Sequence, residues 1–134
     1  WPAASGARPN PVCTGGEPLL QLDRPLDDAL HESEFEIALE TNGTLLPPEG
    51  IDWVCVSPKG RTGLVLKHGN ELKLVFPQAE IDPRDYLHLE FEHFCLQPLA
   101  GPDLAENTHR AIAYCLENPR WRLSLQLHKY VGIP

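Results

Sequence analysis

Basic residues and long apolar runs are scarce in this chain of 134 residues, which also contains no methionine. Eleven lysines and arginines stand against nineteen aspartates and glutamates, which gives a formal net charge of −8. Because nucleic-acid binding depends on clustered positive charge, we expect no nucleic-acid partner. No run approaches the roughly 18 apolar residues of a membrane span, and the first residues lack the basic and apolar regions of a secretory signal. We therefore expect no membrane association and a cytoplasmic location.

Motifs for catalysis and for metal binding are also missing. The four cysteines, Cys13, Cys55, Cys95 and Cys115, form no CxxC pair, and the six histidines form no HExxH motif. We therefore expect no metal ligands in this chain, and buried thiols where the cysteines lie in apolar runs. No GxSxG nucleophile elbow, GxxxxGK(S/T) phosphate loop or GxGxxG fingerprint is present. This pattern suggests that a cofactor does the chemistry.

Short apolar runs that end in proline, glycine or asparagine predict six strands. These runs are PVCTGG, FEIALETN, DWVCVSP, ELKLVFP, HFCLQPL and WRLSLQ. Between the first two, DRPLDDALHES predicts a helix with Pro25 at its start. Between the last two, AENTHRAIAYCLENP predicts a second helix, which Asn107 or Thr108 can cap. The apolar residues expected to share one face of that helix are Ala111, Ile112, Cys115 and Leu116.

This order of elements predicts an α/β fold. A βαβ unit near each end, with strands between them, is most simply built as a parallel sheet, either open or curled into a partial barrel. The length fits one domain. We expect residues 1–10, WPAASGARPN, to form a truncated N-terminal loop, and residues 11–134 to form the domain.

Polar residues follow five of the six strand runs. They include Thr14 and Glu17, then Glu40, Thr41 and Asn42, then Ser57 and Lys59, then Gln97, and finally Gln126 and His128. In parallel sheets, ligands bind at the carboxyl edge, where these residues would meet. Polar residues also begin ordinary loops, so a single one indicates little. Together they predict a site that holds a small polar molecule by many hydrogen bonds.

Glu17 allows two interpretations. It follows Gly15 and Gly16 and precedes Pro18, which is the composition of a tight turn entering a helix. The same residues also suit a ligand site, where glycines let the backbone approach a bound molecule and the carboxylate receives a cation.

A resemblance favours the ligand site. TGGEP after a strand resembles the Gly-Gly-Glu motif of radical S-adenosylmethionine (SAM) enzymes, and ETNGT and VSPK resemble the next strand ends of that superfamily. Within it, VCTGGEPLLQLD, EIALETNGT, DWVCVSPK, GNELKLVFPQ, FCLQPL and WRLSLQLHKYVGIP are similar to the 7-carboxy-7-deazaguanine synthase family of queuosine biosynthesis. The similarity runs from Pro11 to Pro134, and it implies part of a radical-SAM partial (β/α) barrel.

The resemblance implies a carbon–nitrogen lyase. In this family a four-iron four-sulfur (4Fe-4S) cluster cleaves SAM to a 5'-deoxyadenosyl radical, which abstracts hydrogen from 6-carboxy-5,6,7,8-tetrahydropterin. Magnesium-assisted ring contraction then gives 7-carboxy-7-deazaguanine with loss of ammonia. The implied partners are the pterin, a reductant such as flavodoxin, and a second copy in a homodimer.

The resemblance also assigns residues. Glu17 would take the amino group of SAM, and the other cofactor contacts would be Gly15, Gly16, Ser57, Lys59 and Gln97. The substrate contacts would be Thr14, Glu40, His128 and the terminal carboxylate of Pro134. A carboxylate at position 40 suits a donor-rich, guanidine-like edge.

Some family features are absent or altered. The cluster-binding cysteines and the magnesium-contacting threonine would lie upstream of Trp1, so we expect an enzyme fragment or a truncated homologue, without synthase activity as an isolated chain. Leu127 stands where the family has threonine, and Glu34 stands where a glycine-like turn residue would be expected. Two alternatives stay open: another radical-SAM activating enzyme, which the WRLSLQLHK ending speaks against, and a non-catalytic domain that binds SAM and a pterin.

Overall fold

The computed structural model describes residues 10–60 and 63–133. The strands are β1 (Val12–Cys13), β2 (Ala38–Thr41), β3 (Trp53–Val56), β4 (His68–Phe76), β5 (Glu90–Pro98) and β6 (Trp121–Leu123). The α-helices are α1 (Arg24–Glu32), α2 (Leu104–Glu117) and α3 (Leu127–Val131), and the 3-10 helices are η1 (Pro18–Leu20) and η2 (Pro83–Tyr86). Within this part of the chain, all six predicted strands are confirmed as β1 to β6. The two predicted helices are confirmed as α1 and α2.

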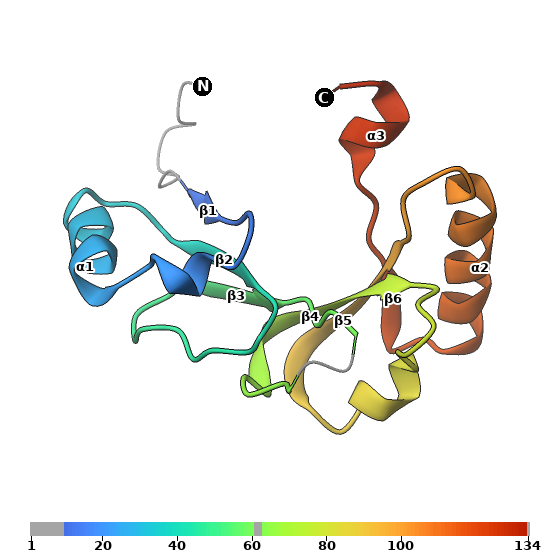
Figure 1. Cartoon of the computed structure of the whole chain (residues 1–134), viewed down its shortest axis with the longest axis horizontal. Coiled ribbons are helices and arrows are strands. Elements are labelled where there is room, and N and C mark those ends of the chain that lie inside the picture. The colour runs from blue at the N-terminus through green and yellow to red at the C-terminus, as the bar shows by residue number, and fades with distance from the viewer. Residues whose placement is uncertain (1–9, 61–62, 134) are drawn as a thin grey trace.

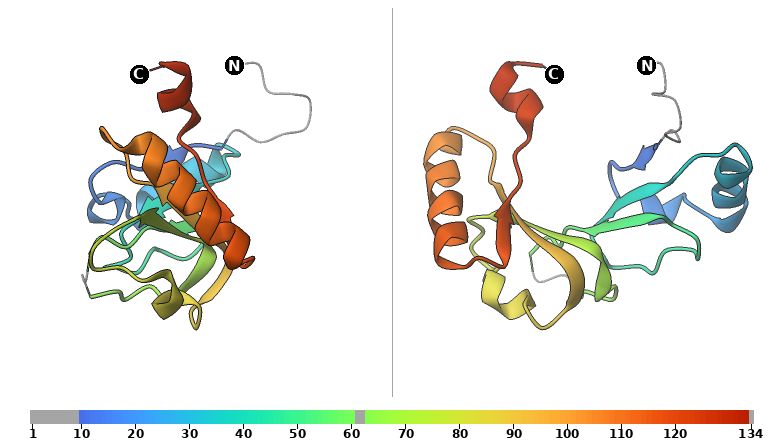
Figure 2. Two further views of the ribbon diagram at one scale, coloured as in Figure 1. Left: turned by 90° about the vertical axis from the view of Figure 1, so that its right-hand side faces the viewer. Right: turned by 180° about the vertical axis from the view of Figure 1, so that it is seen from behind.

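The six strands form one sheet in the order β1-β2-β3-β4-β5-β6, and every neighbouring pair is parallel. The sheet twists and curves, with α1 beside one end and α2 beside the other (Figure 1). Seen from behind, the same two helices flank the curved strands (Figure 2). The predicted parallel α/β architecture is therefore confirmed, and the carboxyl ends of adjacent strands are brought together.

Local sequence sets both ends of α1. At its start, the Asp23 carboxylate accepts a hydrogen bond from the Leu26 backbone N–H at 3.0 Å. At its end, the Phe35 N–H donates to the Leu30 carbonyl and the Glu34 N–H donates to the His31 carbonyl, which is a Schellman motif. Glu34 has φ 61°, in the left-handed region where this motif favours glycine. The sequence expectation of a glycine-like turn at this position is confirmed.

Helix α2 begins earlier than its expected cap. Neither Asn107 nor Thr108 caps it, because both lie inside the helix: the Asn107 amide donates to the Leu99 carbonyl at 3.0 Å, and the Thr108 hydroxyl donates to the Leu104 carbonyl at 2.7 Å. Asn107 therefore ties the helix to the end of β5. The predicted cap is wrong because α2 already begins at Leu104, with Asp103 at the N-cap position.

The apolar face of α2 is also narrower than its sequence suggests. Ala111 is fully buried, and Tyr114 and Cys115 pack on the core. Ile112 and Leu116 are 39% and 78% exposed, so the prediction that they share the buried face is wrong.

The core lies under β4 and β5. Its buried members are Val56, Leu66, Leu72, Leu74, Ile81, Leu89, Phe91, Phe94, Leu96 and Trp121. Leu72 and Leu74 alternate with Glu71 and Lys73 along β4, so the leucines fill the core and the charged residues lie on the opposite face. One face of the sheet is thus dry, and the other carries charge.

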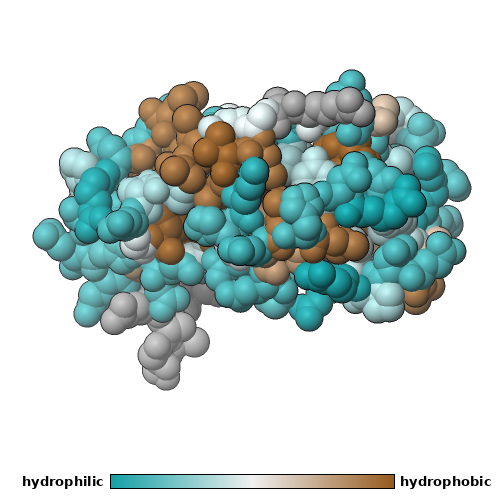
Figure 3. Space-filling view, turned by 90° about the horizontal axis from the view of Figure 1, so that it is seen from below, coloured by the Kyte–Doolittle hydropathy of each residue, from teal (hydrophilic) through white to brown (hydrophobic). Residues whose placement is uncertain are grey.

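The surface keeps some apolar area. Figure 3 shows apolar patches near the middle and to the left of the face seen from below, surrounded by hydrophilic side chains. Leu20, Leu46 and Leu116 are each more than 60% exposed. Among the described residues, no helix is long and apolar enough to cross a bilayer.

Candidate functional site

A cavity of about 200 Å³ lies at the carboxyl ends of the first three strands. Its lining residues are Thr14, Gly15, Gly16, Glu40, Thr41, Asn42, Ser57 and Lys59. Six of these eight were expected from sequence as cofactor or substrate contacts. A second cavity of about 580 Å³ shares Thr14, Gly15 and Gly16 with the first and adds Glu17. The turn after β1 therefore lines both spaces.

Gly15 and Gly16 form the part of this turn that faces open space. Their φ angles are 85° and 52°, a left-handed conformation that glycine adopts without steric cost. A Cβ atom built on either residue would meet no protein atom within 4 Å. Packing within the protein would therefore leave room for a side chain at either position. With glycine at both, the backbone of the turn is open to an approaching molecule.

Three protein groups hold the Glu17 carboxylate. Its Oε1 atom accepts hydrogen bonds from the Thr41 hydroxyl at 2.7 Å and from the Leu19 N–H at 3.2 Å. Its Oε2 atom accepts from the Asn42 N–H at 2.8 Å. A carboxylate has about four lone-pair sites, so these bonds fix its orientation and leave room for one further donor. Both interpretations of Glu17 thus find support, because it is a turn cap and also an oriented acceptor.

The end of β2 is built to hold Glu17. Thr41 is 3% exposed, and its hydroxyl also accepts a hydrogen bond from the Gly43 N–H at 3.1 Å. Gly43 has φ 78°, and a Cβ there would lie 2.5 Å from a Leu64 methyl group and 2.7 Å from a Val56 methyl group. Glycine at this position lets the turn pack closely, which places Asn42 beside Glu17.

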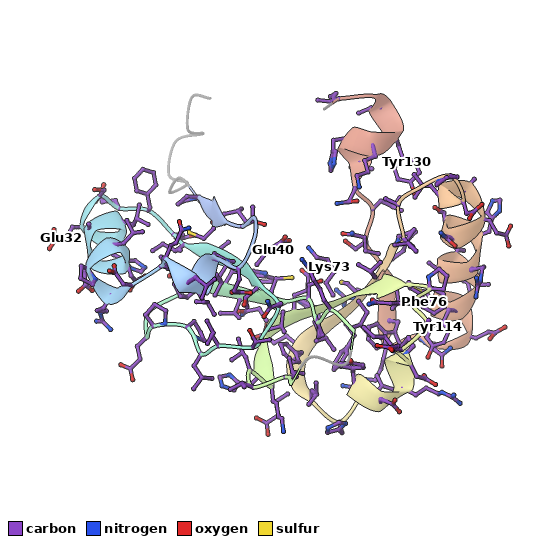
Figure 4. The ribbon with its side chains drawn as sticks, viewed as in Figure 1. Glu32, Glu40, Lys73, Phe76, Tyr114 and Tyr130 are labelled. Carbon is purple, nitrogen blue, oxygen red and sulfur yellow. The ribbon has the colours of Figure 1, made fainter. Side chains whose placement is uncertain are left out.

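Glu40 belongs to a second polar group. Its Oε1 atom forms an ion pair with the Lys73 ammonium of β4, and its Oε2 atom accepts a hydrogen bond from the Thr14 hydroxyl at 3.4 Å. Glu40 and Lys73 point toward one another on the open side of the sheet (Figure 4). Sequence reasoning missed Lys73. The strict alternation of charge and leucine in ELKL could have indicated it, because alternation sends every second side chain to the same face.

Two thiols and a carboxylate continue this charged face. Burial, together with the nearby Glu71 carboxylate, raises the pKa of Cys55 to about 12 and the pKa of Cys95 to about 11. Cys55 and Cys95 are free cysteines on β3 and β5, on either side of β4. They therefore stay as neutral thiols near neutral pH, in line with the expectation of buried, unreactive cysteines.

Not every expected residue reaches the cavity. Gln97 lies near the end of β5, half-buried, and does not line either cavity at the turn. His128 is exposed on α3, which stands beside α2 and apart from β1 (Figure 1). Tyr130 of α3 makes a hydrogen bond of 2.8 Å with Thr108 of α2. Pro134 lies outside the described residues.

Comparison with known proteins identifies relatives of this chain. It is 63% identical over 123 residues to 7-carboxy-7-deazaguanine synthase of Bordetella pertussis, covering 92% of this chain and 59% of that protein. It is 55% identical over 134 residues to the enzyme of the same name from Burkholderia multivorans, covering 100% of this chain and 63% of that protein. No protein-family model matches.

By homology, the chain belongs to the 7-carboxy-7-deazaguanine synthase family. The crystal structure of QueE from Escherichia coli supports this with a TM-score of 0.70 at 32% identity, covering 87% of this chain and 56% of that one. This chain spans about three fifths of the length of the curated synthases it matches. The resemblance of its motifs to this family is therefore confirmed.

The described residues fit SAM better than they fit a metal centre. The open glycine turn and the oriented Glu17 carboxylate fit the amino acid part of SAM, which presents an amine donor and needs close backbone approach. Within residues 10–60 and 63–133, however, no group of three or more histidine, cysteine, aspartate or glutamate side chains could hold a metal ion. These residues thus do not supply the three thiolates of an iron-sulfur cluster.

Proposed function

We propose that this chain supplies the cofactor- and substrate-binding part of a 7-carboxy-7-deazaguanine synthase, a radical-SAM lyase of queuosine biosynthesis. The whole reaction would convert 6-carboxy-5,6,7,8-tetrahydropterin to 7-carboxy-7-deazaguanine with loss of ammonia. The observation that carries the proposal is the joint lining of one cavity by Thr14, Gly15, Gly16, Glu40, Ser57 and Lys59 in a homologue of the synthases.

Each residue takes a role that its geometry supports. Glu17, held by three donors, accepts the amino group of SAM, while Gly15 and Gly16 let the backbone approach it. Ser57 and Lys59 line the same cavity, after β3, and hold the polar remainder of the cofactor. We assign Gln97 to the same cofactor by its place near the end of β5.

Thr14 and Glu40 bind the pterin. They are joined by a hydrogen bond, and the Glu40 carboxylate accepts from the donor-rich edge of the ring. His128 and the carboxylate of Pro134 are proposed to contact the substrate from the end of the chain.

SAM beside a reduced 4Fe-4S cluster supplies hydrogen abstraction in this superfamily. The cluster and Mg²⁺ would need ligands from outside the described residues. We further propose a reductant such as flavodoxin, a homodimer and a cytoplasmic location, as the family resemblance implies.

SAM binding to the chain tests the proposal directly. Isothermal titration calorimetry should show binding to the unmodified chain and at least about tenfold weaker binding to Glu17→Gln, because a charged hydrogen bond is lost. Asn118→Ala is the matched control: it breaks one part-buried hydrogen bond, to the Tyr114 carbonyl at the carboxyl end of α2, and should reduce stability without reducing affinity. Absence of SAM binding, or equal affinities for Glu17→Gln and the unmodified chain, would contradict the proposal.

A further inference from the structure

Lys73 forms an ion pair with Glu40 and is not among the residues that line the cavity. The pair crosses the sheet: Glu40 is on β2, Lys73 is on β4, and β3 lies between them. The side chain of Lys73 is 15% exposed and that of Glu40 is 38% exposed. Glu40 belongs to the lining of the cavity and Lys73 does not. Lys73 therefore contacts the site through Glu40.

The two contacts of Glu40 define its orientation. Lys73 holds Oε1, and the Thr14 hydroxyl, from the turn after β1, holds Oε2 at 3.4 Å. Partners on two different elements restrict rotation of the carboxylate plane. Each oxygen keeps one lone-pair site that these bonds do not use. The unused sites can accept paired N–H donors from a planar ligand, as carboxylates do in bidentate recognition.

We propose that Lys73 is a positioning residue for substrate: it fixes the Glu40 carboxylate in the orientation that accepts the guanidine-like edge of the pterin. This inference rests on the proposed function. It assigns to β4 a part in substrate recognition, although the residue lies in mid-strand rather than at a strand end.

The charge on Lys73 suits this role. Burial by itself would lower the pKa of the Lys73 ammonium, but the hydrogen bond to Glu40 and the nearby Glu71 carboxylate raise it above its ordinary value. Lys73 thus stays protonated at neutral pH. A protonated Lys73 is a permanent donor to Oε1, so the contact that orients the Glu40 carboxylate is kept at neutral pH.

A direct contact between Lys73 and the substrate carboxylate is the competing explanation, and two ligands separate it from positioning. Both 6-carboxypterin and pterin carry the guanidine-like edge, whereas only 6-carboxypterin carries the carboxylate. If Lys73 acts through Glu40, Lys73→Met should weaken both ligands equally. If Lys73 binds the carboxylate, only 6-carboxypterin should be affected.

The experiment measures binding of 6-carboxypterin, pterin and SAM to the full chain by calorimetry, together with thermal unfolding. For Lys73→Met we expect about tenfold weaker binding of both pterins and unchanged SAM affinity, and Lys73→Arg should restore pterin affinity to within about threefold. In the Glu40→Gln background, Lys73→Met should have no further effect on pterin affinity. Arg84→Met makes the same change in net charge at an exposed, distant ion pair and should alter none of the affinities.

Three results would overturn the inference: unchanged pterin binding in Lys73→Met, a loss confined to 6-carboxypterin, or a parallel loss of SAM affinity and stability that marks a purely structural pair. If the unmodified chain binds SAM but neither pterin, the proposed substrate is wrong and the inference falls with it. If it binds neither SAM nor pterin, the proposed function itself fails.

Discussion

The hydroxyl of Thr41 donates a hydrogen bond to Oε1 of Glu17 across 2.7 Å, and this bond joins the end of β2 to the turn after β1. Strand β1 has only two residues, so its pairing with β2 is short. The side-chain bond, together with the Asn42 N–H on Oε2, adds an anchor that the backbone ladder lacks. Through Glu17 and Thr41, which are 24 residues apart in sequence, the motifs TGGEP and ETNGT therefore form one structural unit.

Replacing Gly16 by alanine should affect both stability and cofactor binding. Gly16 has φ 52°, so we expect a loss of about 1 kcal/mol in the free energy of unfolding. Gly16 lines both cavities, and the new methyl group would extend into open space beside it. It should therefore weaken SAM binding. Urea unfolding and calorimetry measure the two effects.

Gly132→Ala is the control for Gly16→Ala. Gly132 has φ 72° after α3, also faces open space and does not line the two cavities. It should show a similar loss of stability and unchanged SAM affinity. If both variants weaken SAM binding equally, the effect comes from global destabilisation rather than from the cavity.

Glu34→Gly should stabilise the protein. The residue occupies the left-handed position of the Schellman motif after α1, which costs roughly 1 kcal/mol or more for a residue with a Cβ. After subtracting the greater freedom of glycine in the unfolded chain, we expect a gain of up to about 1 kcal/mol. Glu34→Ala keeps the Cβ and should change the unfolding free energy by less than about 0.5 kcal/mol. A glycine variant no more stable than the alanine variant would show that the left-handed backbone carries little strain.

This turn also illustrates how far sequence could predict the fold. Sequence predicts local features well. Examples are the end of α1, the six strands and the polar residues at the strand ends, because each of these is determined by residues that are close together in the chain. The parallel order follows because short connections and βαβ units leave few alternatives. For the same reason, Thr14, Gly15, Gly16, Glu40, Ser57 and Lys59 could be expected at one edge.

The features that sequence missed depend on contacts between distant residues. Asn107 has the composition of a cap, but α2 already starts at Leu104, and from inside the helix the Asn107 amide donates to the Leu99 carbonyl. The Lys73–Glu40 pair joins residues 33 apart across an intervening strand. No local pattern gives the partner of Lys73, although alternation gives its face.

His31 should make stability depend on pH. Its Nε2 lies 3.0 Å from the Asp52 carboxylate and its Nδ1 lies 3.4 Å from the buried Asp27 carboxylate. The hydrogen bond to Asp52 raises the pKa of His31 above 6.5, with further contributions from Asp27 and against the opposing effect of desolvation. Because the folded pKa is the higher one, the stabilisation is complete below about pH 6.5 and is lost as pH rises through the folded pKa.

Chemical denaturation at several pH values between about 5.5 and 8.5 checks this. His31→Gln should be less stable than the unmodified chain at the acidic end, and the difference should shrink as pH rises. Asp52→Asn keeps an oxygen that can accept from the Ile37 N–H, at 2.8 Å in the unmodified chain, but removes the charge, so it should flatten the same pH dependence. A constant difference between His31→Gln and the unmodified chain would mean that His31 acts by packing alone.

The thiols beside Glu71 should resist alkylation in the folded protein. With pKa values of about 12 and about 11, Cys55 and Cys95 are only about 0.01% and 0.1% thiolate at pH 8, and the thiolate is the reactive form. Treatment with iodoacetamide followed by mass spectrometry should therefore show slow labelling of both, with ordinary rates restored in urea.

Glu71→Gln removes a charge that raises the pKa of Cys95, so it should accelerate labelling of that thiol. Cys115, whose pKa is raised by burial alone, is the internal control and should label at an unchanged rate. Equal acceleration at Cys115 would indicate that the variant loosens the fold rather than changing the electrostatics around Cys95.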